Sequence, residues 1–337
     1  DSEQSVGHAL SGYQGNAVIS AAASASAQAL NDLFYQNEET SRNVMKQLTS
    51  SDRAQLINVN PLSAMTTGAV YDRLDTALYD GNINVTVPMN SFDGVPASMQ
   101  VSTPVTLDLD HNFWFKLLRG FEYYGGTDGG YDLHNKSFGG VIGYDKAVNA
   151  TTRLGGLFSY AKTDYSTDVM SGDSHDWRIG VYASHDNGTW KTQGMLSYGQ
   201  NRYDFNRYIP YYGDKLSSDY DANIFDVDAK VTYLPQENRA KSWQVAPYGR
   251  LSYTHASQGA YTEEGSSIFA QDMDSASNSS FRAEAGVEWK HQMDKTSSWG
   301  GSVGYKRILS GANPELNGTF AGDANGFTLS GDNDKNY

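Results

Sequence analysis

Alternation between two kinds of side chain governs the segment from Phe281 to Lys290. Every second residue is apolar or small, namely Phe281, Ala283, Ala285, Val287 and Trp289, and mostly charged residues stand between them. In a β-strand these two sets face opposite sides, so one face suits an apolar environment and the other suits water. The same alternation, with an aromatic residue near a strand end, recurs from about residue 112 to residue 310. This repetition predicts one long antiparallel sheet closed on itself, an all-β transmembrane barrel of the outer-membrane type.

Composition agrees with that expectation and excludes other classes. The 337 residues include no Cys, so disulfides and cysteine-based metal sites are ruled out. The chain has a mean hydropathy of −0.56, and it lacks the run of about 18 apolar residues that a membrane-spanning helix needs. Polar residues facing a lumen lower the hydropathy of barrel strands, so this value does not exclude a barrel. The 23 Tyr, 6 Trp and 34 Gly suit aromatic girdles and closely packed strands.

The formal net charge of −14 argues against a nucleic-acid partner, which needs a basic surface. Much of the acidity lies in two segments with a turn-like composition, Asp164 to Asp176 and Asp214 to Asp221. We expect both segments to be solvated loops.

We expect neither catalysis nor a bound cofactor or metal. The seven His residues form no pair three or four positions apart that would converge on a metal. Gly172-Asp173-Ser174 is similar to the nucleophile block of a lipase family, and Asp108 and His111 have a matching spacing. In that family, however, the Asp-x-x-His block follows the nucleophile, whereas here it precedes it. A turn in a long loop is the better interpretation of Gly172 to Ser174.

The N-terminal part of the chain lacks the strand pattern and is expected to be linker and helix. Residues 1–17 are expected to be a linker or the end of an upstream domain, and residues 18–80 a helical region. Within that region an Ala-rich, Gly-free segment predicts a helix over 18–58, and apolar residues four apart predict a second over 63–78. Pro61 is expected to separate the two helices. Residues 81–111, with three prolines, are expected to form a connector to a barrel over 112–337.

Connections between the predicted strands alternate in length. The short ones are 146–151, 186–189, with an Asn187-Gly188 hairpin signal, 235–242 and 292–297. The long, polar ones are 162–176, 204–220, 256–277 and 309–325. Short turns on one side and long loops on the other are typical of bacterial outer-membrane barrels.

About nine complete strands are visible, and a tenth is predicted to start near Phe327. Because bacterial single-chain barrels have an even number of strands, and Asp332 to Tyr337 looks like a loop, we expect strands to be missing at the C-terminus.

Several of these segments together resemble the translocator domain of autotransporters, the type V secretion family. The resemblance rests on Phe113-Trp114-Phe115-Lys116, on Phe138 to Lys146, on Leu154 to Tyr160, and on Gly180-Val181-Tyr182, Trp190 and Leu196 to Gly199, with Arg207 shortly after. It covers residues 112 to 310. The order and spacing of these pieces are more specific than any one of them.

The resemblance implies a twelve-stranded barrel, of which 9–10 strands are visible here, with a helix in its lumen. Both predicted helices, 18–58 and 63–78, are candidates for the lumen helix. Such a domain anchors an upstream passenger in the outer membrane and supports its export to the cell surface. It also implies certain partners: outer-membrane lipid and lipopolysaccharide, the barrel-assembly machinery, periplasmic chaperones and the passenger. Small residues on the inward set (Gly139, Gly143 and Gly286) are expected to leave room for the helix.

Two sets of residues are the candidates for functional positions. The inward charges, expected to line the lumen, grip a helix or pair with one another, are Arg178, Lys191, Asp228, Lys230, Arg250, Arg282, Glu284 and Glu288. The outward aromatics, expected to anchor the barrel at the membrane interface, are Trp177, Trp190, Trp243, Trp289 and Trp299.

Two alternatives to a translocator stay open at this point. A porin-like channel would need no helix before the barrel and would expose the inward charges to solutes. The chain is also compatible with the membrane anchor of a surface hydrolase whose catalytic domain lies elsewhere.

Overall fold

The computed structural model describes residues 4–5, 38–49, 52–76, 99–100, 112–125, 131–265, 267, 269–293, 298–320 and 325–331. Nearly all of the expected linker 1–17, the first part of the predicted helix 18–58 and most of the connector 81–111 lie outside these residues. Within them, no helix is both long and apolar enough to cross a membrane.

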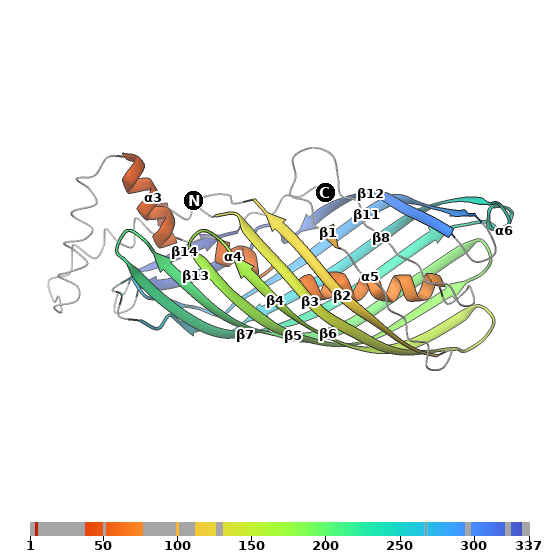
Figure 1. Cartoon of the computed structure of the whole chain (residues 1–337), viewed down its shortest axis with the longest axis horizontal. Helices are drawn as coiled ribbons and strands as arrows, with labels where there is room; N and C mark the ends of the chain where they lie inside the picture. Colours follow the sequence, from red (N-terminus) through yellow and green to blue (C-terminus); the bar gives the residue numbers. More distant parts are fainter. Residues whose placement is uncertain are drawn as a thin grey trace.

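Ten strands form one antiparallel sheet that curls around helix α5 (Figure 1). In spatial order they are β1 (Met99–Gln100), β2 (Phe113–Tyr124), β3 (Leu133–Ala147), β4 (Thr152–Ser166), β5 (Met170–Asp186), β6 (Trp190–Ile209), β7 (Asp214–Tyr233), β8 (Trp243–Gln258), β11 (Ala276–Gln292) and β12 (Ser298–Ser310). Among the described residues β1 and β12 are the two edges of this sheet. The predicted antiparallel, barrel-type architecture is confirmed.

The sheet has two distinct ends. The turn end carries the connection 187–189 and the short helix α6 (Gln236–Arg239), and Gly188 has a φ of +91° there, which suits the predicted Asn-Gly turn. The hairpin end carries the connections 167–169 and 210–213. Both names are used below in this sense.

An apolar band covers the outer face of the sheet near the turn end. On β6 the exposed residues from Trp190 to Tyr198 include Leu196, and on β7 the outward residues from Phe225 to Tyr233 include Val227 and Val231. Each of these two segments has the length of about 9–11 residues that a tilted strand needs to cross a membrane. The band therefore marks the part of the sheet that faces lipid.

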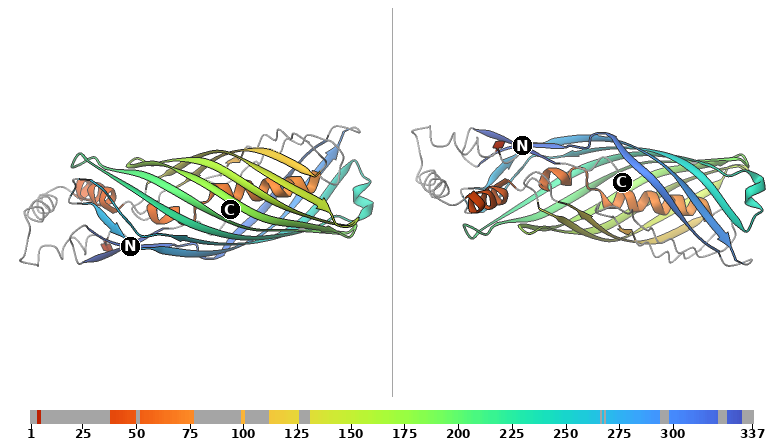
Figure 2. Two further views of the ribbon diagram at one scale, coloured as in Figure 1. Left: turned by 90° about the horizontal axis from the view of Figure 1, so that it is seen from below. Right: turned by 90° about the horizontal axis from the view of Figure 1, so that it is seen from above.

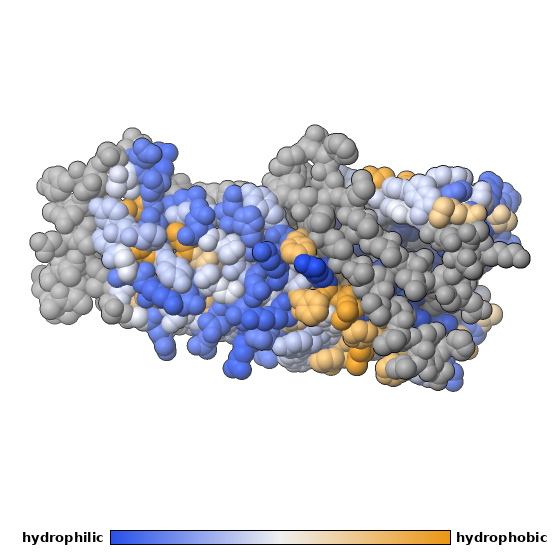
Figure 3. All heavy atoms as spheres, in the orientation of Figure 1, coloured by the Kyte–Doolittle hydropathy of each residue, from blue (hydrophilic) through white to orange (hydrophobic). Residues whose placement is uncertain are grey.

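Beyond that band the outward side chains become polar and the inward side chains become apolar. On β6 the outward residues become Gln200, Arg202 and Asp204, while the inward residues Tyr203 and Phe205 are buried. Figure 3 shows the change on one face, where hydrophobic residues gather toward the middle and right and hydrophilic ones cover most of the left half. β6 and β7, each 20 residues long, thus project well past the membrane at the hairpin end.

The predicted long loops 162–176 and 204–220 are wrong, because both segments are mostly strand. β4 continues to Ser166 and β5 begins at Met170, so only 167–169 connect them, and Asp164 and Asp176 lie in these strands. Likewise Asp214 to Asp221 belong to β7. A strand with charged residues on its outer face no longer shows an apolar lipid face, and its composition resembles that of a loop.

A second, four-stranded antiparallel sheet stands at the hairpin end. Its strands, in spatial order, are β14 (Gly326–Ser330), β13 (Glu315–Phe320), β10 (Gln271–Met273) and β9 (Tyr261–Thr262). The isolated pairing of Ser217 with Glu264 links it to β7. The expectation of loops over 256–277 and 309–325 is therefore wrong in part, and Phe327 belongs to this small sheet and not to a tenth barrel strand.

Among the described residues, the helices α3 (Glu38–Thr49), α4 (Asp52–Leu56) and α5 (Pro61–Thr76) precede the large sheet. The predicted helix over 18–58 thus ends early, since Ile57 to Asn60 form a turn and an extended connection. The second helix starts at Pro61, two residues before its predicted start. Proline suits the first helical position because its missing N–H has no intrahelical partner there in any case.

Glycines on the inner face lie beneath aromatic rings of neighbouring strands. A Cβ added to Gly143 would lie 2.3 Å from the ring of Trp114, and one added to Gly286 would lie 2.7 Å from the ring of Tyr248. The expectation that Gly143 and Gly286 make room for the helix is therefore wrong; they make room for these rings. At Gly139 the added Cβ would meet the backbone of Tyr160 at 2.1 Å, so close strand packing accounts for that glycine.

Gly143→Ala is expected to lower the unfolding free energy of the inserted protein by about 1–3 kcal/mol, because the new methyl group overpacks the site beneath Trp114. Trp114 is only 1% exposed and cannot move outward without losing its contacts. Urea titration of the reconstituted protein measures the change. Gly249→Ala is the matched control, since nothing lies within 4 Å of its added Cβ. Equal stability of the two variants would contradict the packing argument.

Candidate functional site

The lumen of the large sheet is occupied by α5, which starts near the middle of the long strands, where Asn60 meets Arg178 of β5, and runs toward the turn end against β2 to β6 (Figures 1 and 2). Its two ends are fixed differently. The backbone carbonyl of Asn60 accepts the first helical bond, from Ala64 N at 3.4 Å, as an N-cap residue does. At the other end, Lys191 Nζ donates to the carbonyl of Leu74 at 3.1 Å, where a cation also complements the helix dipole.

Apolar side chains of α5 form one buried cluster with the wall of β2 to β6. The helix contributes Leu62, Met65, Ala69, Val70, Tyr71 and Leu74, and the wall contributes Trp114, Leu118, Val141, Leu157, Ala161, Tyr182 and Met195. All of these side chains are buried. Ala64 and Gly68, one turn apart on another side of the helix, are exposed. The helix is therefore seated on one wall of the sheet.

Polar contacts add to this apolar seat. Lys116 Nζ lies 3.3 Å from a carboxylate oxygen of Asp72 and donates to the carbonyl of Ala69 at 3.1 Å. The hydroxyl of Thr66 lies 2.9 Å from that of Ser159. Asp75 pairs with Lys191 and accepts from Gln193 Nε2 at 3.0 Å. The wall thus forms polar contacts with both the side chains and the backbone of the helix.

The wall opposite contributes charges to Tyr71. The hydroxyl of Tyr71 donates to Asp228, which also accepts two bonds of 2.9 Å from Arg250 Nε. The guanidinium of Arg250 lies 5.3 Å from the centroid of the Tyr71 ring, and Lys230 Nζ lies 5.7 Å from it. One helical tyrosine is consequently held by a hydrogen bond and by two cations.

Asp145 is a buried hub that the sequence did not suggest. The indole of Trp114 donates to the Tyr182 hydroxyl at 2.6 Å, and that hydroxyl donates to Asp145 at 2.9 Å. Arg73 of α5 donates to the same carboxylate at 2.9 Å, and Arg153 pairs with it as well. Asp145 stands at an inward position of β3 near the turn end. Two sequence features could have indicated this site: the inward position of Asp145 and the presence of Arg73 in the lumen helix.

The structure places all eight predicted inward charges on the inner face. Arg178, Lys191, Asp228 and Lys230 are buried, and Arg250, Arg282, Glu284 and Glu288 are half-buried. Some pair with one another or with inner-face neighbours: Lys230 with Glu288, Arg250 with Asp228, and Arg178 with Asp226. Arg178 also donates to the side chain of Asn60, just before α5. Helix contacts and mutual pairing therefore coexist.

The predicted interface aromatics all belong to the outer face. Trp190, Trp243 and Trp299 are about half exposed near the turn end, at 49%, 48% and 49%. Trp243 stacks on His291 with ring centroids 4.4 Å apart. Trp177 and Trp289 are half-buried, the former 6.2 Å from the ring of Tyr198.

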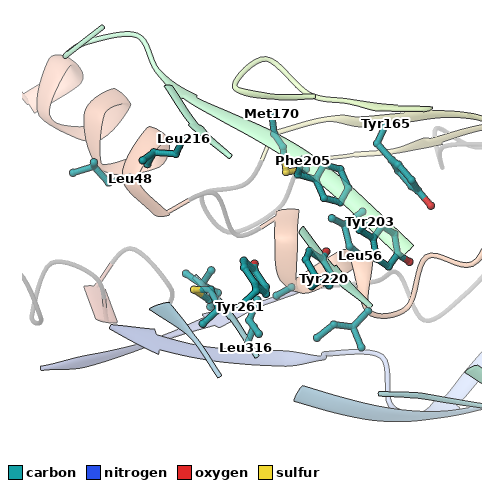
Figure 4. Close-up of a cluster of buried hydrophobic side chains, with 14 of the residues drawn as sticks. Leu48, Leu56, Tyr165, Met170, Tyr203, Phe205, Leu216, Tyr220, Tyr261 and Leu316 are labelled. Atoms are coloured by element: carbon teal, nitrogen blue, oxygen red, sulfur yellow. The ribbon is translucent and has the colours of Figure 1, made fainter. Parts of the chain in front are cut away.

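A compact apolar core closes the hairpin end, where α3 and α4 meet the small sheet. It includes Leu48 of α3, Leu56 of α4, Tyr203 of β6, Tyr220 of β7 and Phe320 of β13, all buried (Figure 4). Its members come from elements on both sides of α5 in the sequence. The segment just before the lumen helix is thus enclosed by the end of the sheet.

Three charges are buried inside this closure. Glu263 pairs with Arg207, with Nε to Oε1 at 2.7 Å, and with Arg53 of α4 at 3.2 Å. Arg207 also donates to the Phe269 carbonyl at 2.9 Å, and Gln271 donates to the Leu48 carbonyl at the same distance. All three charged side chains are at most 5% exposed. Removing one partner of such a group leaves an uncompensated buried charge.

Among the described residues no group of three or more His, Asp or Glu side chains is arranged to hold a metal ion. Gly172 to Ser174 lie in β5, and Ser174 is buried with its hydroxyl donating to Tyr165 at 3.3 Å. Asp108 and His111 lie outside the described residues. The arrangement of the lumen is that of a wall built to hold a polypeptide helix.

A model of the autotransporter β-domain family matches residues 113–337. This chain belongs to the autotransporter family. Both the resemblance read from the sequence and the predicted role as an outer-membrane translocator domain are thereby confirmed.

Two relatives give this assignment context. An extracellular serine protease of Serratia marcescens is 23% identical over 200 residues, which are 57% of this chain and 18% of that protein. The chain therefore spans less than a fifth of that relative. The translocator domain of the autotransporter NalP from Neisseria meningitidis has a similar fold, with a TM-score of 0.53 and 13% identity over 61% of this chain and 75% of that one. At this identity the likeness shows the fold alone.

The seat of α5 in this translocator domain is testable by cross-linking, because the chain has no Cys of its own. Thr66→Cys with Ser159→Cys is expected to form a disulfide in an oxidising compartment, since the native hydroxyl oxygens are 2.9 Å apart. Non-reducing electrophoresis detects the bond. Ala64→Cys with Ser159→Cys is the control, because Ala64 lies on the exposed side of α5. Equal cross-linking of both pairs would contradict the seat.

The closure at the hairpin end is expected to depend on pH through Glu263. Burial raises the pKa of Glu263, but Arg207 and Arg53 lower it by more, so it lies below its ordinary value of 4.5. The ion pairs therefore contribute full stability above pH 4.5, and this stability is lost as the pH falls through the lower, folded-state pKa. The protection factors of the amide hydrogens in residues 52–56 and 271–273, which compare each exchange rate with its intrinsic rate at the same pH, are expected to stay high from pH 7 to 4.5 and to fall below pH 4.5.

The variant Glu263→Gln separates this effect from general acid unfolding. It removes the carboxylate that Arg207 and Arg53 share, so exchange in the same residues is expected to be fast already at pH 7. Glu264→Gln is the control, since Glu264 is exposed and adjacent. If Glu263→Gln behaved like Glu264→Gln, the ion pairs would not hold the closure.

Proposed function

We propose that this translocator domain exports an N-terminal passenger to the cell surface and then keeps α5 in its lumen as a plug and anchor. The direction of α5 carries the proposal. Its N-terminal end points toward the hairpin end, which projects past the apolar band, and its C-terminal end lies at the turn end, where β2 begins. A chain upstream of α5 therefore leaves on the hairpin side, which is the extracellular side of barrels with short periplasmic turns.

The contacts of α5 support its role as a plug. Its buried apolar side rests on β2 to β6, and Lys116, Lys191, Asp145 and Asp228 hold it from both walls. Of the predicted inward charges, we assign Lys191, Asp228, Lys230 and Arg250 to gripping the helix. We assign Glu284, Glu288 and Arg282 to the polar lining of the lumen. A porin-like channel is disfavoured because it would leave this lumen to solutes.

The proposed function also assigns roles to the other segments of the chain, to the outward Trp residues and to partner molecules. Residues 1–17 would be the end of the passenger or a linker, 18–80 a helical segment, 81–111 a connector and 112–337 the translocator with its extracellular closure. The five outward Trp residues would anchor the barrel at the two membrane interfaces. Partners would be outer-membrane lipid and lipopolysaccharide, the barrel-assembly machinery, periplasmic chaperones and the passenger, and the domain would catalyse no reaction.

Protease protection on intact cells tests the export role. An epitope is placed before Asp1 in the natural full-length protein, and external protease is added. The expected result is loss of the epitope while the membrane-embedded strands survive. An epitope that stays protected until the outer membrane is broken would refute export through this domain.

Replacing residues 61–76 by a flexible Gly-Ser segment of equal length is expected to raise the ion conductance of the reconstituted protein, because such a segment does not fill the lumen. Planar bilayer recordings measure the change. The same replacement of residues 81–96, which lie outside the described residues, is the control for chain flexibility alone. Conductance equal to that of the unmodified protein would rule out the plug.

A further inference from the structure

Basic side chains follow the apolar band on four neighbouring strands of the outer face. On each strand the basic residue stands on the hairpin side of the last outward aromatic residue of the band. The pairs are Phe138 and Lys136 on β3, Tyr160 and Lys162 on β4, Trp177 and His175 on β5, and Tyr198 and Arg202 on β6. The four basic residues are named here the basic border. Because aromatic residues sit at the membrane interface, the basic border lies at the level of the lipid headgroups.

The basic border is continuous across the sheet. In the register of the strands Lys162 is opposite His175, and His175 is opposite Arg202. Lys136 is opposite Asp164, one outward position beyond Lys162. All four basic side chains are exposed. Since neighbouring strands lie about 4.8 Å apart, adjacent members of the border can contact one ligand together.

Arg119 of β2 adds a further charge from within the band. Its side chain is outward and exposed, and its guanidinium lies 4.8 Å from the centroid of the Phe121 ring, one outward position nearer the hairpin end. Phe121 is opposite Lys136 in the register of β2 and β3. Arg119 thus directs its charge along the strand toward the basic border, as long basic side chains do near a membrane surface.

The border belongs to one wall of the sheet. On the next three strands, β7, β8 and β11, the outward residues that follow the band are Asn223, His255 and Ser279, and none of these is Lys or Arg. The strands that carry the border outside are among those on which α5 is seated inside. A ligand of the border therefore contacts one defined side of the protein and does not surround it.

Aspartates lie just beyond the border, toward water. The next outward residues on β4, β5 and β6 are Asp164, Asp173 and Asp204, which are opposite one another. Lys162 Nζ lies 3.5 Å from Asp173, but an ion pair this exposed contributes little and leaves the cation available. A soluble anion that approaches from water meets these carboxylates first. An anion held at the membrane by acyl chains lies at the basic border instead, so the order of charges favours a lipid headgroup.

We propose that the basic border binds the phosphate groups of lipopolysaccharide in the outer leaflet, with the acyl chains of that lipid on the apolar band of β3 to β6. The inference rests on the proposed function, because that function places the hairpin end outside the cell. It assigns the proposed contact with lipopolysaccharide to one set of residues on one wall.

The chemistry of the border fits a headgroup with more than one phosphate. The guanidinium groups of Arg202 and Arg119 can each donate to two phosphate oxygens at once, and Lys136 and Lys162 act as point charges between them. The border spans four strands, so two separate phosphates are neutralised together. A phospholipid with a single phosphate engages only part of this width and is expected to bind more weakly.

Binding of purified lipopolysaccharide to the natural full-length protein in detergent tests the site. The variant Lys136→Gln/Lys162→Gln/Arg202→Gln is expected to raise the dissociation constant at least about tenfold, since each basic side chain near an anionic lipid surface adds to the attraction. The control is Lys146→Gln/Lys215→Gln/Lys241→Gln, which removes the same charge from exposed positions outside the border and is expected to bind like the unmodified protein. Heat-dependent electrophoretic migration verifies that each variant is folded.

Competing ligands identify the chemistry that is recognised. Dephosphorylated lipopolysaccharide is expected to bind the unmodified protein as weakly as the border variant binds the intact lipid. Inorganic phosphate and phosphatidylglycerol are expected to compete poorly. Equal affinity of the two triple variants, or no loss on dephosphorylation, would overturn the proposal. Full displacement by inorganic phosphate would show a general anion site and would overturn it as well.

Photo-cross-linking in cells provides the second readout. Benzoyl-phenylalanine replaces Tyr160, which is 46% exposed beside Lys162, and antibodies against lipopolysaccharide detect the product. A cross-link is expected at Tyr160 and none at Tyr233, an outward residue that is 38% exposed near the turn end of β7. Lack of a product at Tyr160, or equal products at both positions, contradicts the inference.

The inference and the proposed function fail in different ways. If an epitope before Asp1 stays protected in intact cells while the purified protein still loses affinity on mutation of the border, the export role is wrong. If the epitope is exposed but the border variant binds as tightly as the unmodified protein, only the role of the basic border is wrong.

Discussion

Each long strand of this sheet passes through two solvents, and the roles of its faces are set by that passage. In lipid, every backbone group must be paired within the sheet and the outward side chains must be apolar, so polar residues can gather only inside. Beyond lipid, water accepts charges on the outside and the inner face is free to become a core. On β6 the change falls between Tyr198 and Tyr203, within one uninterrupted strand. The buried charges around α5 and the apolar closure at the hairpin end both follow from this inversion.

Both enclosed spaces combine apolar burial with buried polar contacts. Around α5, apolar contacts with β2 to β6 are joined by hydrogen bonds from Lys116, Ser159 and Asp228, and each such bond contributes a net stabilisation of about 0.5–1.5 kcal/mol because it replaces a bond to water. At the hairpin end, side chains such as Leu48, Leu56 and Tyr220 exclude water, which contributes roughly 25 cal/mol for each Å² of apolar area removed from it. There the buried polar contact is the carboxylate of Glu263 with its two arginines.

The sequence predicted the lipid-facing parts of the strands correctly and failed for the parts that lie beyond the lipid. Strict alternation in Phe281 to Lys290 identified a lipid-facing strand, and the antiparallel barrel-type sheet followed from its repetition. The same rule failed for Asp164 to Asp176 and Asp214 to Asp221, because past the lipid the outer face is charged and the inner face carries Tyr and Leu. A search for apolar outward faces does not find strands whose apolar face is turned inward.

Functional residues could be predicted only where the alternation within a single strand identifies them. Inward charges such as Arg178 and Lys230 could be assigned from alternation alone. The hub at Asp145 could not, because its partners Arg73, Arg153 and Tyr182 come from three other elements. Nor could Glu263, whose partner Arg53 is 210 residues away in the sequence. Such pairings depend on the register and curl of the sheet, which no local pattern encodes.

The sequence separation of these pairs also orders the events of assembly. The contact of Arg53 with Glu263, and the core that Leu56 shares with Tyr203 and Tyr220, join the segment before the lumen helix to β6, β7 and the residues after β9. These contacts require the large sheet to exist and the segment 52–59 to have reached the hairpin end. Because Glu263, Arg53 and Arg207 are costly to bury singly, partial closure is less favourable than either the open or the complete state. The closure thus behaves as a two-state element that forms only once the segment 52–59 has reached the hairpin end.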